Sequence, residues 1–125
     1  MVEELRLRYE IIDAGLSYEV GVAGARLSSS QRQKLGLARS LIKQPDLLIV
    51  NEALAGLDTA AERRIIARAR EQMQSRGIFW VLARVKLAEM FDRVVVMERG
   101  RLVGDGEYTA LLEENAQLRG LLEQE

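Results

Sequence analysis

The stretch LSSSQRQKLGLARSLIKQPDLLIVNEALAGLDTAAE, residues 27–62, decides the fold of this chain. Ser28 is followed three residues later by Gln31 and then by an apolar-periodic segment, which is the signature of a helix start with a capping box. This helix should end before Pro45, because a residue that precedes proline is disfavoured in the helical conformation. The apolar run at 47–50 is too short for a helix, and it predicts a strand buried on both faces.

The same pattern then repeats. Thr59 and Glu62 predict a second capping box, which opens a long helix closed by Gly77. A second buried strand is expected at 78–83. Alternation of helices with buried strands predicts an α/β fold with a mainly parallel sheet of about four strands. The helix positions expected to face the core are Leu35, Ala38, Leu41, Ile42, Ile65, Ile66, Ala69 and Met73.

The two ends of the chain complete this expectation. Residues 2–13 have the pattern of a short helix, with Leu5, Tyr9 and Ile12 on one face. A short helix is expected at 85–91. Two strands joined by a tight turn at Arg99 and Gly100 should follow, and then a helix over 108–125, which carries Leu111, Leu112, Leu118, Leu121 and Leu122.

Composition excludes several classes of function. Hydrophobic residues make up 48% of the 125 residues and the net charge is −1, which predicts a globular protein without an electrostatic reason to bind nucleic acid. The absence of Cys and His removes thiolate chemistry and the commonest general base and metal ligand. No apolar run approaches the ~20 residues of a membrane span. The start of the chain is too charged for a signal peptide, so the cytoplasm is the simplest location.

Polar residues follow the predicted buried strands. In parallel sheets ligands bind at the carboxyl ends of the strands, which draws attention to Asn51, Glu52 and Arg84. The free amides at the helix start near Ser28 could hold an anion. Each of these features also has an ordinary structural interpretation, as a helix cap or as a solvated loop residue.

The order of these motifs resembles a known family. YEVGVAGARLSSSQRQKLGLARSLIKQPDLLIVNEALAGLD, residues 18–58, is similar to the second half of the nucleotide-binding domain of ABC (ATP-binding cassette) transporters of the exporter type. In that family an LSGGQ signature opens a helix, and a proline, a strand ending in Asp-Glu (Walker B) and a SALD D-loop follow. VVVMERGRLVGDGEYTALLEE, residues 94–114, resembles the ending of the family domain. The resemblance runs from about residue 9 to about residue 115.

The resemblance implies roles for particular residues. Ser28, Ser29, Ser30 and Gln31 match the signature, which holds the γ-phosphate of ATP bound to the opposite subunit. Glu52 matches the catalytic glutamate that polarises the attacking water. Three further residues match the Walker B aspartate, the D-loop aspartate and the switch histidine, in that order: Asn51, Asp58 and Arg84.

The sequence also departs from the family pattern. No G-x-x-x-x-G-K-[ST] motif occurs in these residues, so the phosphate-cradling loop and its lysine are missing. Asn51 is a weaker ligand for Mg²⁺ than the usual aspartate. Ser29 and Ser30 replace glycines that let a phosphate approach the backbone closely. Arg84 replaces the histidine, and the D-loop has Gly56 where the family prefers alanine. We expect a degenerate site that does not hydrolyse ATP alone.

The missing half of the family domain includes the P-loop strand. In the family this strand lies between those matching 78–83 and 94–98, so its absence leaves a gap or two open edges. The sheet could close around the gap, two chains could associate, or the chain could be part of a longer protein. We expect a single partial nucleotide-binding domain over 1–125, with the signature helix at 28–44, core elements at 45–106 and a C-terminal helix at 107–125.

The expected function is to complete the site of a partner that carries a P-loop. ATP and Mg²⁺ would then bind only with that partner, which would be a half-domain or a subunit; no metal site is expected in the chain alone. A transmembrane transporter subunit would place the protein at the inner face of a membrane. The alternatives are a nucleotide-independent structural or regulatory module that homodimerises, and a hydrolase that uses Glu52 as its base.

Overall fold

The structure is a computed structural model that describes residues 17–54 and 56–125. It divides into two compact units, Met1–Val81 and Leu82–Glu125, which we call the first and the second unit. The predicted helix at 2–13 lies outside the described residues. Each unit is described by itself below.

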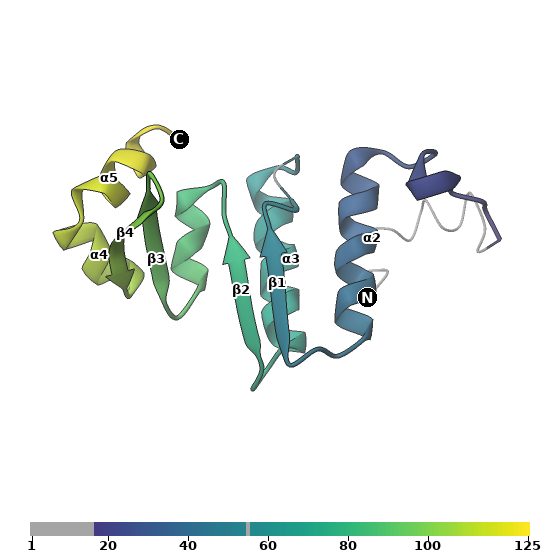
Figure 1. Ribbon diagram of the computed structural model, residues 1–125, viewed down its shortest axis with the longest axis horizontal. Helices are drawn as coiled ribbons and strands as arrows, with labels where there is room; N and C mark the ends of the chain where they lie inside the picture. Colours follow the sequence, from purple (N-terminus) through teal and green to yellow (C-terminus); the bar gives the residue numbers. More distant parts are fainter. Residues whose placement is uncertain (1–16, 55) are drawn as a thin grey trace. The chain divides into compact units, whose positions relative to one another are not determined.

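The first unit contains one parallel pair of strands with helices packed against it (Figure 1). In the pair, Leu47 lies opposite Gly77 and Asn51 opposite Val81. Parallel strands need a crossover connection, which the helix between them supplies. The elements in chain order are η1 (Val22–Gly24), α2 (Ser29–Ile42), β1 (Leu47–Asn51), α3 (Thr59–Gln72) and β2 (Gly77–Val81).

The start and the end of α2 confirm the prediction from the sequence. Ser28 is the N-cap, and its side chain accepts a hydrogen bond from the amide of Gln31. The Ser28 amide in turn donates to Gln31 Oε1 at 2.8 Å, which completes the capping box. Lys43 caps the other end, two residues before Pro45.

The bounds of α3 differ from the prediction at both ends. Asp58, and not Thr59, is the N-cap, because Asp58 Oδ1 accepts from the amide of Ala61 at 2.8 Å. The helix ends at Gln72, well before Gly77. The four residues between Gln72 and Gly77 form a turn that includes Ser75 at φ 67°, a left-handed conformation that cannot continue a helix.

The core of the first unit joins both long helices to one face of the strands. Two of the positions expected to face inward are exposed, Leu35 and Ile42. The buried stripe of α2 is centred on Leu37 and Leu41, and at about 100° per residue Leu35 and Ile42 lie a third of a turn or more away from its centre. The other expected positions are buried: Ala38, Leu41, Ile65, Ile66, Ala69 and Met73.

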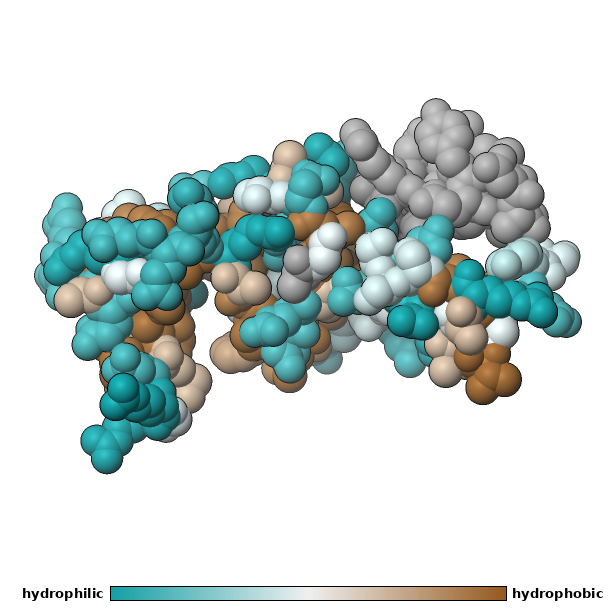
Figure 2. All heavy atoms as spheres, turned by 90° about the horizontal axis from the view of Figure 1, so that it is seen from above, coloured by the Kyte–Doolittle hydropathy of each residue, from teal (hydrophilic) through white to brown (hydrophobic). Residues whose placement is uncertain are grey.

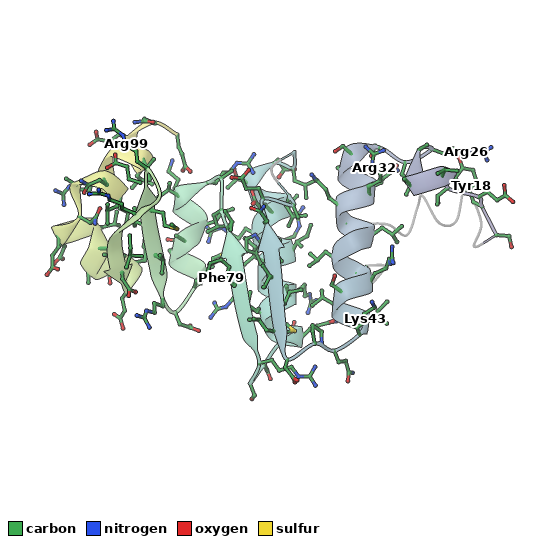
Figure 3. All side chains as sticks on the ribbon, in the orientation of Figure 1. Tyr18, Arg26, Arg32, Lys43, Phe79 and Arg99 are labelled. Atoms are coloured by element: carbon green, nitrogen blue, oxygen red, sulfur yellow. The ribbon has the colours of Figure 1, made fainter. Side chains whose placement is uncertain are left out.

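Burial along the strands alternates, so the prediction of strands buried on both faces is wrong. Leu48 and Val50 are buried against α2 and α3. Leu47 and Ile49 point to the opposite face and are exposed, as is Phe79 on β2 (Figure 3). The two helices cover one face of a two-stranded sheet, and no described element of the first unit buries the other.

The second unit is an antiparallel hairpin packed with short helices. Arg99 at φ 48° and Gly100 at φ 76° form its tight turn, as predicted. Positive φ at both central residues gives the twist that hairpins favour. Its core contains Val96, Leu111 and Leu118. The elements are η2 (Val85–Met90), β3 (Val94–Glu98), β4 (Arg101–Gly106), α4 (Tyr108–Glu114) and α5 (Ala116–Glu123).

The sheet arrangement differs from the expected mainly parallel sheet of about four strands. Within residues 17–54 and 56–125 there are two separate two-stranded sheets, β1–β2 and β3–β4. Only the first is parallel. A connection of two residues, as between β3 and β4, permits only antiparallel pairing.

The expected C-terminal helix over 108–125 is broken at Asn115. This residue has extended backbone angles, φ −106° and ψ 108°, and ends α4. Its Oδ1 accepts from the amide of Leu118 at 2.9 Å, so it also caps α5. Its Nδ2 donates to the carbonyl of Val103 at 2.8 Å and ties the break to β4. Leu111 and Leu118 are buried on either side of the break, whereas Leu121 is exposed.

Candidate functional site

Three predicted site segments gather at one edge of the first unit. The chain enters α2 at this edge, returns to it along β1 and enters α3 there (Figure 1). The N-terminal ends of both helices and the carboxyl end of β1 therefore share this edge. Ligands of α/β proteins bind at such an edge. We call it the carboxyl edge.

The helix start at Ser28 is the part of this edge best suited to an anion. The first amides of α2, at Ser29 and Ser30, have no acceptor within the helix. Ser30 Oγ lies 3.2 Å from Ser28 Oγ, so two hydroxyl groups stand side by side. The first turn holds no acidic residue, and the helix is 14 residues long, which aligns a full macrodipole toward the edge. Amides, hydroxyls and a positive dipole end fit a phosphate group.

The capping box limits what Ser28 and Gln31 can offer. Ser28 Oγ accepts a hydrogen bond from the Gln31 amide at 3.2 Å, and Gln31 Oε1 accepts one from the Ser28 amide. A hydroxyl that accepts in the cap still has a proton to donate. The same serine can therefore cap the helix and contact an anion.

Asn51 ends β1 at the carboxyl edge and Glu52 follows it, and both residues are exposed. The Glu52 amide donates to the carbonyl of Val81 at 3.2 Å, which continues the strand pairing by one residue. Glu52 nevertheless has φ 47°, an uncommon conformation for a residue with a side chain. Leu54, buried in the core, anchors the loop that follows. The backbone of Glu52 is thus held by the strand pairing, and the residue is exposed to solvent.

Asp58 also lies at the carboxyl edge, as the N-cap of α3. The Ala61 amide that donates to its carboxylate holds the pKa of Asp58 below its usual range. Asp58 therefore stays ionised at neutral pH, and its carboxylate caps the first turn of α3. A cation site is not formed by these acids alone: within the described residues no group of three or more acidic side chains is close enough to hold a metal ion.

Arg84 belongs to the second unit, whereas the other predicted site residues belong to the first. It is half-buried and precedes η2, where its backbone forms the N-cap without a side-chain cap. The Glu125 carboxylate takes that role, because it accepts from the amide of Val85 and, at 3.4 Å, from that of Lys86. The sequence could not indicate this contact, since 40 residues separate Glu125 from Val85 and no local pattern links them.

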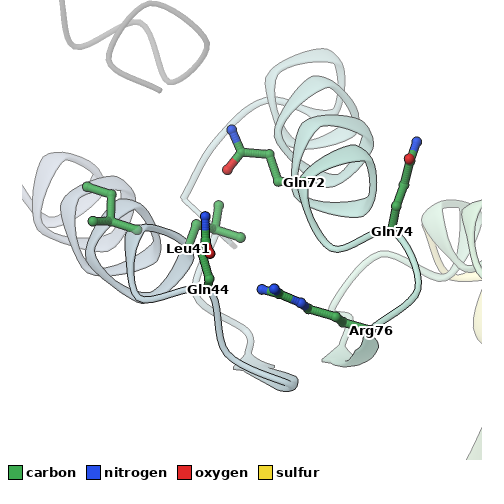
Figure 4. A pocket seen from close by; sticks show the side chains of 6 residues that line it. Leu41, Gln44, Gln72, Gln74 and Arg76 are labelled. Carbon is green, nitrogen blue, oxygen red and sulfur yellow. The ribbon is translucent and has the colours of Figure 1, made fainter.

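A hollow of about 480 Å³ opens at the far ends of the two long helices, away from the carboxyl edge (Figure 4). Three glutamine side chains and Arg76 give it a polar lining, and no predicted site residue reaches it. Its lining residues are Leu41, Ile42, Gln44, Gln72, Gln74 and Arg76.

Helix length and polarity bear on membrane insertion. In the part of the chain that the structure describes, every helix is too short or too polar to cross a membrane.

Comparison with known proteins finds relatives whose names describe them as ATP-dependent or ATP-binding. No protein-family model matches the chain. The chain is 44% identical over 100 residues to an ATP-dependent lipid A-core flippase of Chromobacterium violaceum, a match that covers 80% of this chain and 17% of the flippase. It is 37% identical over 109 residues to the heterocyst differentiation ATP-binding protein HepA of Nostoc, covering 87% and 18%. The chain thus spans less than a fifth of the length of these relatives.

The fold agrees with the sequence matches. A solved structure of a bacterial Atm1-family ABC exporter with ATP bound superposes with a TM-score of 0.88 at 25% identity, over 98% of this chain and 22% of that one. The chain is therefore a relative of the ABC exporters, and its predicted resemblance to the C-terminal part of their nucleotide-binding domain is confirmed.

Proposed function

We propose that this chain supplies the signature-helix side of a shared ATP site in an ABC exporter and that a P-loop-bearing region supplies the other side. The observation that carries the proposal is the start of α2. There Ser28 and Ser30 place two hydroxyls and unbonded amides at the same edge as Asn51 and Glu52.

The residues present fit one part of such a site and not the whole. Ser28–Ser30 would bind a terminal phosphate through hydroxyls and amides. Glu52 would orient a water molecule and accept its proton, because an exposed carboxylate at a strand end is free to act as a base. ATP supplies the phosphoryl group that such a water attacks. Mg²⁺ would meet only the neutral amide oxygen of Asn51 where the family has a carboxylate.

The inability of the chain to hydrolyse ATP alone follows from what these 125 residues lack. They contain no G-x-x-x-x-G-K-[ST] motif to hold the β and γ phosphates. Arg84 replaces the switch histidine, and a guanidinium group donates hydrogen bonds but accepts none. The partner would therefore hold most of the nucleotide, and Ser28–Ser30 would contact it from the opposite side.

The two separate sheets suggest how the partner would join the fold. Within the described residues β2 pairs only with β1 and β3 only with β4, so each has an unpaired edge. Unpaired edges accept a further strand. A P-loop strand that pairs there would complete one nucleotide-binding domain, and Ser28–Ser30 would then contact the nucleotide held by a second such domain. A transmembrane transporter subunit would then hold the assembly at the inner face of a membrane.

Calorimetric titration with MgATP tests the proposal. The titrations would use the chain alone, a P-loop-bearing partner alone, and the mixture. As partner we would use the residues that precede the matched segment in the Chromobacterium violaceum flippase. Ser28→Asp is the informative variant, because aspartate is as good an N-cap as serine but places a negative charge where the phosphate would lie. Ser40→Ala, near the other end of the same helix, is the control.

We expect the mixture to bind MgATP more tightly than the partner alone. Ser28→Asp should abolish this gain and Ser40→Ala should preserve it. Equal affinity of the mixture and the partner alone, or an unchanged gain with Ser28→Asp, would refute the proposal.

A further inference from the structure

The hollow at the far ends of α2 and α3 is a second candidate site in the first unit. Its volume of about 480 Å³ lies within the range of pockets that hold small molecules. Ser28 and Asp58 cap the opposite ends of the same helices, and each helix has 14 residues, so about 20 Å separates the hollow from the carboxyl edge. Figure 2 views the chain from the side of the carboxyl edge, which is the side away from the hollow. The hollow is therefore separate from the proposed ATP site.

Arg76 gives the hollow a positive charge. It is the one charged residue among the described residues that line the hollow, and its side chain is directed toward Gln44 and Leu41 (Figure 4). Within residues 17–54 and 56–125, no acidic side chain pairs with the Arg76 guanidinium and no carbonyl accepts from it. A guanidinium group stays ionised and binds a carboxylate through two parallel hydrogen bonds. Arg76 is thus available to an anion.

Three primary amides surround this charge, and they come from three places in the chain. Gln44 follows α2, Gln72 ends α3 and Gln74 belongs to the turn after α3. Each amide offers two N–H donors and one oxygen, and the guanidinium offers donors alone, so donors outnumber acceptors. Leu41 and Ile42 add an apolar wall. This lining fits the oxygens of an anion that has an apolar carbon skeleton.

The helix dipoles decide which anion is favoured. The C-terminal ends of α2 and α3 lie at the hollow, and each carries a partial negative charge. Arg39 and Arg70, in the last turns of these helices, offset part of it. Repulsion by the helix ends grows with the charge of the ligand. A singly charged carboxylate therefore fits better than a phosphate group, which carries nearly two charges at neutral pH.

Gln44 is held in an unfavourable backbone conformation beside the hollow. Its φ of 49° lies in the left-handed region, which is uncommon for a residue with a side chain. It also precedes Pro45, and a residue before proline favours extended conformations. Glycine would adopt this conformation without strain. Strain of this kind is typical of functional sites, so a role for the Gln44 side chain explains why glutamine stands here.

We propose that the hollow binds a small organic carboxylate. Its carboxylate group pairs with Arg76, its other polar groups bond to the glutamine amides, and its carbon skeleton lies against Leu41 and Ile42. This site is independent of the proposed function, because no residue of the proposed ATP site lines the hollow.

NMR titration of the full chain with N-acetylleucine tests this proposal. The probe carries one carboxylate, one amide and one apolar side chain, and N-acetylleucinamide, which lacks the carboxylate, is the control ligand. The signals to follow are the Arg76 Nε–H group and the side-chain amides of Gln44, Gln72 and Gln74. Arg76→Gln removes the charge, and Arg99→Gln, in the hairpin turn of the second unit, is the matched control variant.

We expect saturable shifts of these signals, with a dissociation constant of about 1 mM or lower. Arg76→Gln should weaken binding at least tenfold, as should replacement of the probe by N-acetylleucinamide, and Arg99→Gln should leave binding within twofold. Shifts that do not saturate, wild-type affinity in Arg76→Gln, or inorganic phosphate that binds as tightly as N-acetylleucine would overturn the proposal.

Two further arms sharpen the test. Gln44→Gly should raise the melting temperature, because it relieves the left-handed strain, and should weaken binding of N-acetylleucine; unchanged binding would contradict the role of this side chain. A blocked tripeptide that ends in leucine distinguishes a free acid from the end of a polypeptide. We expect it to bind no more tightly than N-acetylleucine, and at least tenfold tighter binding would overturn the assignment to a small acid.

Discussion

Asn115 joins three elements of the second unit, and its replacement has a calculable cost. Its side chain caps α5 through the Leu118 amide and donates to the Val103 carbonyl of β4. Loss of an N-cap costs about 1 kcal/mol. Loss of the second hydrogen bond costs about 1 kcal/mol more. Asn115→Ala should therefore destabilise the second unit by about 2 kcal/mol.

Gly104 provides the second arm of this experiment. A Cβ atom at Gly104 would lie 2.6 Å from Asn115 Nδ2, so Gly104→Ala must displace the Asn115 side chain. The single variant then loses the same two hydrogen bonds. In Asn115→Ala the Asn115 amide no longer blocks a Cβ atom at Gly104. Of the atoms that this Cβ would meet, the nearest that remains is Val96 Cβ at 3.3 Å. The double variant should cost about 1–2 kcal/mol less than the sum of the singles.

Hydrogen exchange at the Leu118 amide measures this coupling directly. Loss of about 2 kcal/mol should speed its exchange by about 30-fold in either single variant. In the double variant exchange should be little faster than in Asn115→Ala. Strictly additive effects of the two substitutions would refute the claim that the missing Cβ of Gly104 makes room for the Asn115 side chain.

Three further predictions follow from contacts in the two units. Arg93 donates two hydrogen bonds to Asp105 at 2.6 Å and lowers the pKa of its carboxyl, so the stability it adds is present above about pH 4 and lost as pH falls through the lowered folded-state pKa. As pH falls through that range, the free energy of unfolding should drop less in Asp105→Asn than in the wild type. An equal drop in both proteins would contradict a stabilising role of the Arg93–Asp105 pair. Glu125→Gln should speed amide exchange at Val85 several-fold, because an amide oxygen accepts more weakly than a carboxylate; equal exchange would exclude this cap. Ser28→Ala should lower the free energy of unfolding by about 1 kcal/mol and Ser28→Asp should not, and equal melting temperatures of the two variants would show that the capping box adds nothing.

Local patterns in the sequence predicted local structure well. The pair Ser28 and Gln31 predicted the start of α2 within one residue, and Arg99-Gly100 predicted the hairpin turn. Each rests on interactions among residues close together in the chain. The capping box at Thr59 was displaced by one position, because Asp58 is an equally good cap and lies directly before it.

Properties that depend on distant residues were not predictable. The apolar run at 47–50 suits a strand covered on both faces, but the number of covering elements is decided by the rest of the fold. Leucine spacing after Tyr108 favoured one continuous helix, whereas the bond from Asn115 to Val103 decides the break. The place of Asn51 and Glu52 at the carboxyl end of β1 was predictable, because strand direction sets which end of a strand faces that edge.

The central claim is that this chain and a P-loop-bearing partner share one nucleotide. Binding is reciprocal, so a nucleotide held by both chains must tighten their association as much as their association tightens nucleotide binding. The most direct test is the dissociation constant between the chain and the flippase segment, measured with and without MgATP. The account predicts that MgATP strengthens association of the wild type at least tenfold and leaves Ser28→Asp unchanged. A dissociation constant of the wild type that is the same with and without MgATP would contradict it.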